Sequence, residues 1–374
     1  MNFETTHEQR LLQDSVTRFV ADNYDLDSRM KLAAGKPGFS IQHWQTMAEL
    51  GWLALPFAEA DGGFDGGQIE TMLIMEQFGK GLVLEPYLAS IVMGGGALRR
   101  GASGALKAET LPGVIDGSRQ LAFAYAEEQA RFDLHDVTTT ARAQGQEFVL
   151  NGHKSMVLNA ATATQIVVST RTSGGQIDED GISLFLVDAD AKGVKLDNFP
   201  TVDGLQASEI HFTDVKIPKA RLLGDLNRGF TVLNAVANDA ILALAAEALG
   251  AMEVLNQDTV SYTQAREQFD HPLADFQVLQ HRMVEMFMEY EQCKSLLFRA
   301  TMETAAGSDG AQKTIHALKH LIGKSGIFIG ENAVQLHGGM GMTEELRVGH
   351  YFKRLVVIDT QFGNSDYHLR RFAA

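Results

Sequence analysis

The sequence predicts an α+β protein in which a β-rich middle part separates two helical parts. Apolar residues recur at steps of three and four up to about residue 118 and again from residue 229 onward, which is typical of amphipathic helices. Between these parts, short β-branched or alternating runs follow one another at intervals of roughly 8–15 residues, which is typical of an antiparallel barrel or sandwich. We therefore expect an N-terminal helical domain at 1–118, a middle β-domain at 119–228 and a C-terminal helical domain at 229–374.

The first helical part begins with a helix over Thr5–Tyr24, for which Thr5 or Thr6 is the expected cap. A second helix is capped by Ser40 and ends at Gly51. The remaining predicted helical segments are 68–79, 82–100 and 103–117.

The middle part reads as seven strands, and a hairpin is predicted within it. In QGQEFVLNGHK the dipeptide Asn151-Gly152 is the expected turn, because this pair suits a two-residue hairpin loop. The predicted strands are 120–126, 136–143, 147–150, 165–172, 181–188, 194–198 and 207–215.

The last part returns to a helical period. Phe230–Leu255 is rich in Ala, Leu and Val, which predicts a buried central helix. The helices expected after it are 254–266, 274–306, 312–336 and 350–357.

Composition excludes several classes of function. The 374 residues carry a net charge of −15, so a nucleic-acid or anionic-membrane partner is not expected, because such partners need clustered cations. The lone Cys293 forms no intrachain disulfide and is expected in the core. There is no signal-peptide pattern and no apolar run of about 18 residues, so we expect a cytoplasmic enzyme without a membrane span.

Two stretches point to a phosphate-bearing ligand. In SYTQAREQFDHP, Arg266, Gln268 and Phe269 place a guanidinium, an amide and an aromatic ring within four residues. The planar fork of Arg matches phosphate oxygens, although an ordinary helix–turn–helix with solvated polar residues is the simpler explanation when these residues are taken alone. A second stretch, AVQLHGGMGMTEE, supplies bare glycines that let a phosphate or ribose approach backbone N–H groups.

Together these motifs make the chain resemble the acyl-CoA dehydrogenase family over essentially its whole length. YTQAREQFDHPLADFQVLQHRMVEM, AVQLHGGMGMTEE, ETTHEQRLLQDSVTRFV and ALPFAEADGGFDGG carry the resemblance. VGHYFKRLVVIDTQFGNSDYHLRR and AYAEEQARFDLHDV are most similar to the small subunit of pimeloyl-CoA dehydrogenase. The resemblance implies a helical domain, a β-domain and a four-helix bundle that bind FAD and oxidise the Cα–Cβ bond of an acyl-CoA, with a carboxylate as base.

Carried over residue by residue, the resemblance retains one half of the cofactor site. In the family the bundle of one subunit contacts the pyrophosphate and adenosine of its neighbour's FAD. Asp270 stands where the family usually has Gly, close to the expected pyrophosphate. The residues that match these contacts are Arg266, Gln268, Phe269, Gln335, Gly338, Gly339 and Asn364.

The flavin-ring contacts of the family are replaced here by groups that are poor donors. Ala126-Glu127-Glu128 occupies the place of the family's Thr-Glu-Pro segment, and Phe132 occupies the place of its Ser. Met156-Val157-Leu158 occupies the place of its Trp-x-Thr segment. Tyr125 and Asn159 remain as polar groups, as cofactor contacts or as ordinary turn residues.

The catalytic base of the family is also missing from its usual places. Phe362 occupies the usual Glu position and Ala240 the alternative one. Glu247 and Asp239 are weak candidates for a relocated base; Glu247 lies two turns beyond Ala240 in an apolar helix. His281 and His337 lack partners at metal-ligand spacing and are expected to be structural, so no metal site is predicted.

We therefore hypothesise a division of labour between two subunits. This chain would bind the AMP and pyrophosphate end of FAD, and a larger acyl-CoA dehydrogenase paralogue would supply the flavin pocket and the base. The substrate would be the CoA thioester of a dicarboxylic or bulky acid, and the electron acceptor an electron-transfer flavoprotein. The alternatives are a homomeric dehydrogenase with a relocated base, and a structural subunit that binds no FAD.

Overall fold

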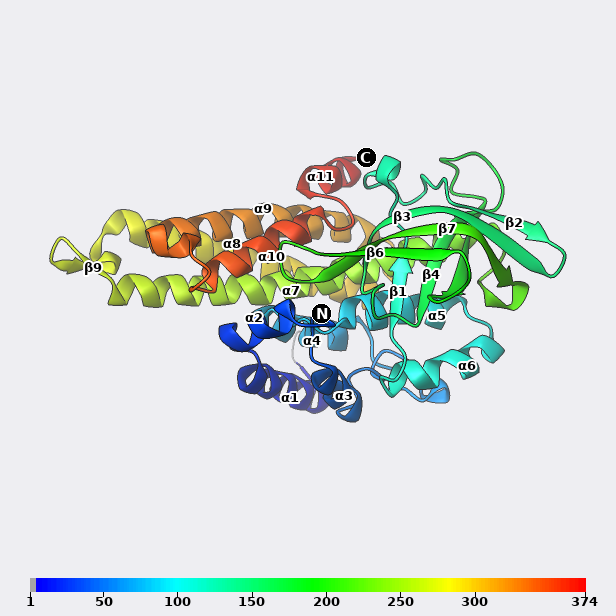
Figure 1. Cartoon of the computed structure of the whole chain (residues 1–374). Coiled ribbons are helices and arrows are strands. Elements are labelled where there is room, and N and C mark those ends of the chain that lie inside the picture. Colours follow the sequence, from blue (N-terminus) through cyan, green and yellow to red (C-terminus); the bar gives the residue numbers. More distant parts are fainter. Residues whose placement is uncertain (1–4) are drawn as a thin grey trace. The chain divides into compact units, whose positions relative to one another are not determined.

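The computed structural model describes residues 5–374 and confirms the α+β class. Helices occupy the chain up to Ile115, strands lie between Leu121 and Leu223, and helices return at Gly229 (Figure 1). The described residues form two compact units: the first contains residues up to 31, 68–83 and 241–374, and the second contains 32–67 and 84–240. The two boundaries between the three predicted domains stay a prediction.

The first unit is built from helices and one small hairpin. Helix α1 begins with a capping box, in which Thr6 accepts from the backbone N–H of Gln9 and the Gln9 side chain accepts from the Thr6 N–H. Its members are α1 (His7–Asn23), α2 (Leu26–Ala34), α4 (Gln68–Gly81), α7 (Gly229–Ala265), β9 (Glu267–Gln268), β10 (His271–Pro272), α8 (Gln277–Ala305), α9 (Ala311–His337), α10 (Val348–Thr360) and α11 (Ser365–Ala373); α2 and α7 continue into the second unit.

Helix α7 is one continuous helix of 37 residues, whereas two were predicted. The expected break fell at the polar residues after Leu255. The helix continues through this polar segment because the buried hydroxyls of Thr259 and Thr263 donate to the carbonyls of Leu255 and Thr259. Helix α7 is long and apolar enough to cross a membrane, but 72% of its most apolar window is buried, as in a core helix.

Glycines set how closely the helices of the first unit approach one another. A Cβ on Gly330 of α9 would lie 2.3 Å from the Phe352 ring of α10. A Cβ on Gly79 of α4 would lie 1.9 Å from the carbonyl oxygen of Glu247 on α7. Figure 1 shows α7, α8, α9 and α10 running side by side, with the β9–β10 hairpin at one end.

The second unit combines short helices with an eight-stranded sheet. Its helices are α3 (Ile41–Glu49), the π-helix η2 (Tyr87–Gly95), α5 (Gly96–Gly101) and α6 (Gly104–Ile115). Its strands are β1 (Leu121–Ala124), β2 (Thr140–Gln144), β3 (Glu147–Leu158), β4 (Gln165–Arg171), β5 (Ile182–Asp188), β6 (Val194–Pro200), β7 (Gln206–Pro218) and β8 (Leu222–Leu223).

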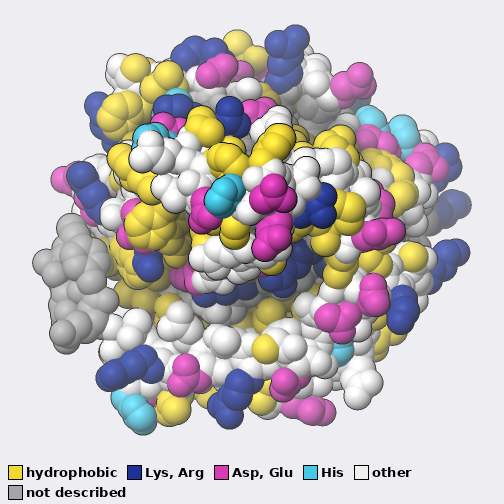
Figure 2. Space-filling view, turned by 90° about the vertical axis from the view of Figure 1, so that its left-hand side faces the viewer, with side chains coloured by type: hydrophobic (Ala, Val, Ile, Leu, Met, Phe, Trp, Pro, Cys, Tyr) yellow, Lys and Arg dark blue, Asp and Glu magenta, His cyan; other side chains and the backbone are white. Residues whose placement is uncertain are grey.

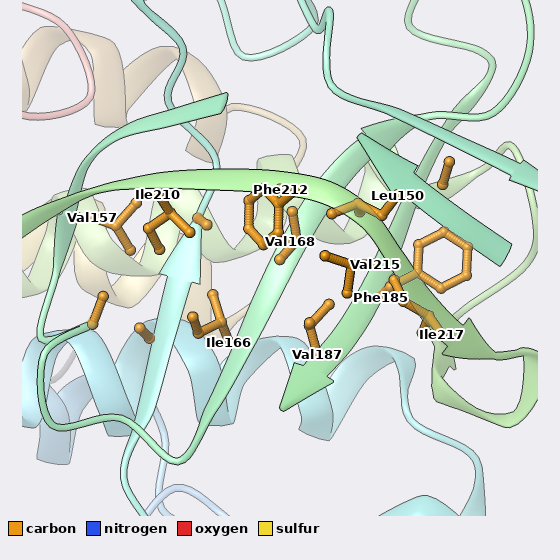
Figure 3. Packing of buried hydrophobic residues seen from close by; sticks show 14 of the residues in the cluster. Leu150, Val157, Ile166, Val168, Phe185, Val187, Ile210, Phe212, Val215 and Ile217 are labelled. Atoms are coloured by element: carbon orange, nitrogen blue, oxygen red, sulfur yellow. The ribbon is translucent and has the colours of Figure 1, made fainter. Parts of the chain in front are cut away.

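The sheet is mixed rather than purely antiparallel. Its strand order is β6-β7-β3-β2-β4-β5-β8, and β4 pairs in parallel with both β1 and β2. The apolar side chains that alternate along these strands, such as Ile166, Phe185 and Ile210, form its buried core (Figure 3).

The predicted hairpin exists, but its turn lies elsewhere. β2 and β3 pair antiparallel from Gln144 and Glu147 onward, so Gly145 and Gln146 form the turn. Asn151 and Gly152 lie inside β3, where the register against β7 shifts. Gly152 is required there because a Cβ would lie 2.5 Å from the Thr139 hydroxyl.

Candidate functional site

The β9–β10 hairpin presents the first predicted ligand element at the end of α7. Gln268 pairs with His271 and Glu267 with Pro272, so Phe269 and Asp270 form a two-residue turn. Both turn residues have positive φ, 57° and 63°, as a type I′ turn requires. Asp tolerates this backbone region, and Gly even more so, which explains why Asp270 stands at a position where glycine is common.

The side chains of this element point to solvent. The Arg266 backbone is fixed, since its N–H donates to Tyr262 O at 2.8 Å and its carbonyl accepts from Leu273. Its guanidinium is exposed and makes no ion pair with any residue from 5 to 374. Phe269 is 85% exposed and touches only the edge of Phe276 among the described aromatic rings. Arg266 is therefore available to an anion from outside the chain.

The second element lies at the C-terminal end of α9, where three glycines have different reasons to be glycine. Gly338 has φ 59° and ψ −141°, a conformation that essentially only glycine adopts. A Cβ on Gly341 would lie 2.7 Å from the Val334 carbonyl oxygen. A Cβ on Gly339 would meet nothing within 4 Å, so the fold itself does not require glycine there.

A ring stack brings the two elements together. Tyr262, one turn before Arg266, packs on His337, which directly precedes Gly338; their ring centroids are 4.3 Å apart. The exposed side chains of Arg266, Gln268 and Gln335 and the open backbone of Gly339 therefore share one end of the first unit. Figure 2 views the molecule from the side on which this hairpin projects in Figure 1, and its hydrophobic, acidic and basic side chains are interspersed there.

Asn364 does not join this group. Its side-chain oxygen caps α11 by accepting from Tyr367 N–H at 3.0 Å. The neighbouring Ser365 carbonyl is bound by His320 of α9. His320 and Gln335 are separated by about 22 Å along that helix at 1.5 Å per residue, so the structure places Asn364 far from the other predicted contacts.

Phe362, at the expected base position, lies in the turn between α10 and α11. It is buried with a positive φ of 57°, and the next residue, Gly363, also has positive φ. Lys319 is fully buried beneath this turn and donates to the carbonyls of Ile358, Asp359 and Gly363 at 2.8–2.9 Å. Burial lowers the pKa of Lys319 to about 8, although the nearby Asp359 favours its charged form.

A chain of side-chain hydrogen bonds holds the same turn from the other side. His368 Nε2 donates to Phe362 O at 2.9 Å, which leaves its Nδ1 to accept from His316 Nδ1 at 2.9 Å. His316 Nε2 then accepts from the Gln312 amide at 3.3 Å. This assignment requires both imidazoles to be neutral. Burial, with help from Arg371, lowers their pKa values to about 4 for His316 and about 3 for His368.

The two carboxylates proposed as relocated bases are both engaged by guanidinium groups. Glu247 is buried and forms a bidentate ion pair with Arg354, with N–O distances of 2.6 and 2.7 Å. In the second unit, Asp239 accepts from Arg100 at 2.5 Å and from Arg99 at 3.4 Å. Arginine partners stabilise the anion and occupy the oxygens that would take a proton.

The segment expected to face the flavin ring is built around a buried ion pair that sequence reasoning missed. Lys154 is fully buried and donates to Glu127 Oε1 at 2.7 Å and Ser169 Oγ at 2.8 Å. Glu127 also accepts from the N–H groups of Thr138 and Thr139. Burial opposes its ionisation, but Lys154 and these bonds outweigh it and lower the pKa of Glu127 to about 2.

The two halves of a flavin site therefore differ in what they offer. The Arg266 end provides free polar groups and open backbone that fit a nucleotide diphosphate. In the second unit, Glu127 is already paired with Lys154, and the Asn159 amide donates to the Leu121 carbonyl at 3.2 Å as part of a turn. Phe132, Met156 and Leu158 bring no side-chain N–H or O–H donor to the positions where the family's flavin contacts were expected.

The other residues singled out have structural positions. Cys293 is fully buried in α8, as predicted, and burial raises its thiol pKa to about 12, which makes it inert. His337 is buried in the stack with Tyr262, and His281 is exposed on α8. Among residues 5–374 no group of His, Cys, Asp or Glu is suited to hold a metal ion.

Sequence models of acyl-CoA dehydrogenases match almost the whole chain: the N-terminal domain matches 6–118, the middle domain 122–215 and the C-terminal domain 227–374. The probable acyl-CoA dehydrogenase YngJ of Bacillus subtilis is 27% identical over 371 residues, which cover 98% of this chain and 97% of YngJ. The FAD complex of PigA superposes with a TM-score of 0.92 at 26% identity, covering 100% of this chain and 98% of PigA. The Tcur3481–Tcur3483 steroid ACAD superposes with a TM-score of 0.88 at 26% identity, covering 98% and 96%.

Proposed function

The chain belongs to the acyl-CoA dehydrogenase family, and from that premise we propose that it is the smaller subunit of a heteromeric dehydrogenase. FAD is the family's cofactor and supplies, when bound, the acceptor for the electrons removed from the Cα–Cβ bond of an acyl-CoA. In this proposal the chain contributes the half of the FAD site that holds AMP and pyrophosphate. A larger paralogue contributes the flavin-ring pocket and the catalytic carboxylate.

The observation that carries the proposal is the contrast between the two halves. Arg266 and Gly339 are free and exposed, although nothing within residues 5–374 gives them a structural task. Phe362 and Ala240 cannot accept a proton, and the carboxylates of Glu247 and Asp239 are held by arginines. A chain that keeps the phosphate-binding residues but has no proton acceptor at either base position of the family is best understood as part of a shared site.

The residues of this chain would act by binding and orientation. The Arg266 guanidinium would pair with pyrophosphate oxygens, and the Gln268 and Gln335 amides would bind neighbouring polar atoms. Gly338 and Gly339 would let a ribose or phosphate approach the backbone. Phe269, held at the tip of the hairpin, would cover a flat group. None of these groups takes part in proton transfer.

The partner and substrate follow from the same reasoning. A mixed assembly, an α2β2 tetramer or a heterodimer, fits a chain that has half a site. The similar steroid ACAD carries two protein designations, Tcur3481 and Tcur3483, which supports a two-chain arrangement. We propose the CoA thioester of a dicarboxylic or bulky acid as substrate, the trans-2-enoyl-CoA as product, an electron-transfer flavoprotein as acceptor and the cytoplasm as location.

Two other functions are less well supported. A homomeric dehydrogenase with Glu247 or Asp239 as base would have to break a guanidinium pair before each proton transfer. A purely structural subunit without FAD would leave the free Arg266 and the open Gly339 without a purpose.

Co-expression with the larger paralogue tests the proposal. We expect a stable mixed complex that oxidises acyl-CoA with an artificial electron acceptor, while this chain alone shows no turnover. If this chain alone oxidises acyl-CoA at the rate of the mixture, or if no complex survives gel filtration, the shared-site proposal is wrong.

A further inference from the structure

A pocket of about 370 Å³ opens beside the end of α9, and all the residues that line it belong to the first unit. The stacked rings of Tyr262 and His337 contribute aromatic surface to its lining. Aliphatic side chains complete the apolar part of the lining: Leu26, Leu346 and Val348. A cavity of about 150 Å³ is enough to hold benzene, so this pocket has room for an aromatic side chain.

The rim of the pocket carries one carboxylate that no cation neutralises. Arg347 and Asp258 bind each other through two hydrogen bonds of 2.6 Å, so their charges cancel. Glu345 lines the same pocket, is exposed and forms no ion pair with any residue between 5 and 374. The pocket therefore combines an apolar, aromatic interior with one unpaired negative charge. It suits an aromatic side chain that has a cation beside it.

The β9–β10 hairpin presents that combination of groups. Phe269 is 85% exposed at its tip, in a two-residue turn that projects beyond the helices of the first unit (Figure 1). Arg266, three residues earlier, is exposed and has no acidic partner in the described part of the chain. The Glu267 side chain leaves the opposite face of the hairpin, because side chains alternate along a strand. Asp270 adds a carboxylate at the tip, so the cation that can meet the pocket is Arg266.

The hairpin and the pocket lie at the same end of the first unit, which makes this end self-complementary. Tyr262 lines the pocket and precedes Arg266 by one helical turn. Between His337 and Glu345, which both line the pocket, Met342 is 78% exposed and adds apolar surface. Aromatic residues, Met and Arg are the types enriched in protein interfaces. In a pair of chains related by a two-fold axis, each such contact forms twice.

We propose that two copies of this chain associate through this end, with Phe269 of each copy seated in the pocket of the other and Arg266 of each copy paired with Glu345 of the other. The occupant is a second copy because one chain carries both the ring with its guanidinium and the pocket with its carboxylate. The association goes beyond the proposed function and needs neither FAD nor the larger paralogue. It covers Phe269 and Arg266, so it is a state of the chain in which the hairpin holds no cofactor.

Sedimentation velocity of the purified, flavin-free chain across the micromolar range tests the association. We expect a reversible equilibrium between monomer and dimer. Phe269→Ser should weaken it roughly tenfold or more, as the loss of a central aromatic anchor does. Phe287→Ser, at a phenylalanine of α8 that is 54% exposed, is the matched control and should leave the equilibrium unchanged. A wild-type chain that stays monomeric throughout, or a Phe269→Ser chain that associates like the wild type, would overturn the proposal.

Charge reversal tests which residues meet. Arg266→Glu and Glu345→Arg should each weaken the dimer, because each change places like charges opposite one another. The double variant restores opposite charges and should recover association, which two independent surface changes would not do. Circular dichroism checks that each variant is folded. A folded double variant that associates no better than the single variants would contradict the pairing. Flavin and the paralogue are absent from these solutions, so the outcome is independent of the shared FAD site.

Discussion

At the scale of single residues, Gly339 separates what the fold needs from what a ligand needs. Its missing Cβ would point into open space, whereas Gly338 has a backbone conformation that essentially only glycine adopts and Gly341 is required by a close contact. Arg266 has the same character among side chains: its backbone is fixed by the fold and its guanidinium is left free.

Gly339→Ala is therefore expected to leave stability unchanged and to weaken cofactor binding. The added methyl meets no atom of this chain, so the melting temperature should shift by less than about 2 °C. A methyl between the backbone and a phosphate should raise the rate of flavin loss from the mixed complex. Gly310→Ala, which is equally open at the other end of α9, is the matched control. Equal flavin retention by both variants would contradict a ligand role for Gly339.

Arg266→Ala should weaken the binding of FAD by the mixed complex. A charge-assisted hydrogen bond contributes roughly 1.5–3 kcal/mol to binding, so its loss should make the dissociation constant for FAD ten- to hundredfold larger. Arg266→Lys should recover only part of it, because an ammonium cannot bind two oxygens with a planar fork. Arg142→Ala, at an exposed arginine of β2, is the control. Flavin titration of the apo-complex measures the effect, and an unchanged dissociation constant would remove Arg266 from the site.

At the scale of elements, buried polar networks hold the ends of the last helices. Lys319 binds three carbonyls at the end of α10, and the His316–His368 pair holds the turn that contains Phe362. Arg354 on α10 is joined to Glu247 on α7. The first two networks fix where the turn lies, and none of the three offers a free proton acceptor next to Phe362.

The histidine pair makes stability depend on pH below neutrality. Burial lowers the pKa of His316 to about 4 and of His368 to about 3, against 6.5 for an unperturbed histidine. Between pH 6.5 and about 4 these histidines bind protons in the unfolded chain but not in the folded chain, so the free energy of unfolding falls as the pH falls. The loss is at most on the order of 3 kcal/mol for His316 and about 5 kcal/mol for His368. Urea unfolding at pH 7 and pH 5 should show the decrease, and His316→Gln should reduce it. An unchanged pH dependence in that variant would contradict the neutral pair.

The Glu247–Arg354 pair should govern stability rather than catalysis. Removing one partner of a buried pair costs roughly 3–5 kcal/mol, so Glu247→Gln should lower the denaturant midpoint strongly. Glu247→Leu combined with Arg354→Met should recover most of the loss, because no buried charge is left over. A Glu247→Gln protein with native stability and activity reduced a thousandfold would identify Glu247 as the base instead.

At the scale of the whole molecule, the order of helices, sheet and helices could be predicted because local periodicity encodes it. The Arg266 and Gly339 elements could be picked out because each is a short contiguous stretch, and their role as a ligand site stays a prediction. The turn at Asn151-Gly152 was wrong, because the contact between Gly152 and Thr139 depends on strand pairing rather than on local turn preference. The bonds from His316 to His368 and from Lys319 to Gly363 join residues 52 and 44 positions apart, and no local pattern indicates them.

The most direct test of the shared site is the flavin content of the chain with and without its partner. The chain purified alone should lack the visible absorbance of bound FAD, because one half-site offers no flavin-ring pocket. The mixed complex should hold one FAD for each pair of unlike chains, and acyl-CoA should bleach it. Stoichiometric FAD in the chain alone, bleached by acyl-CoA, would contradict the account.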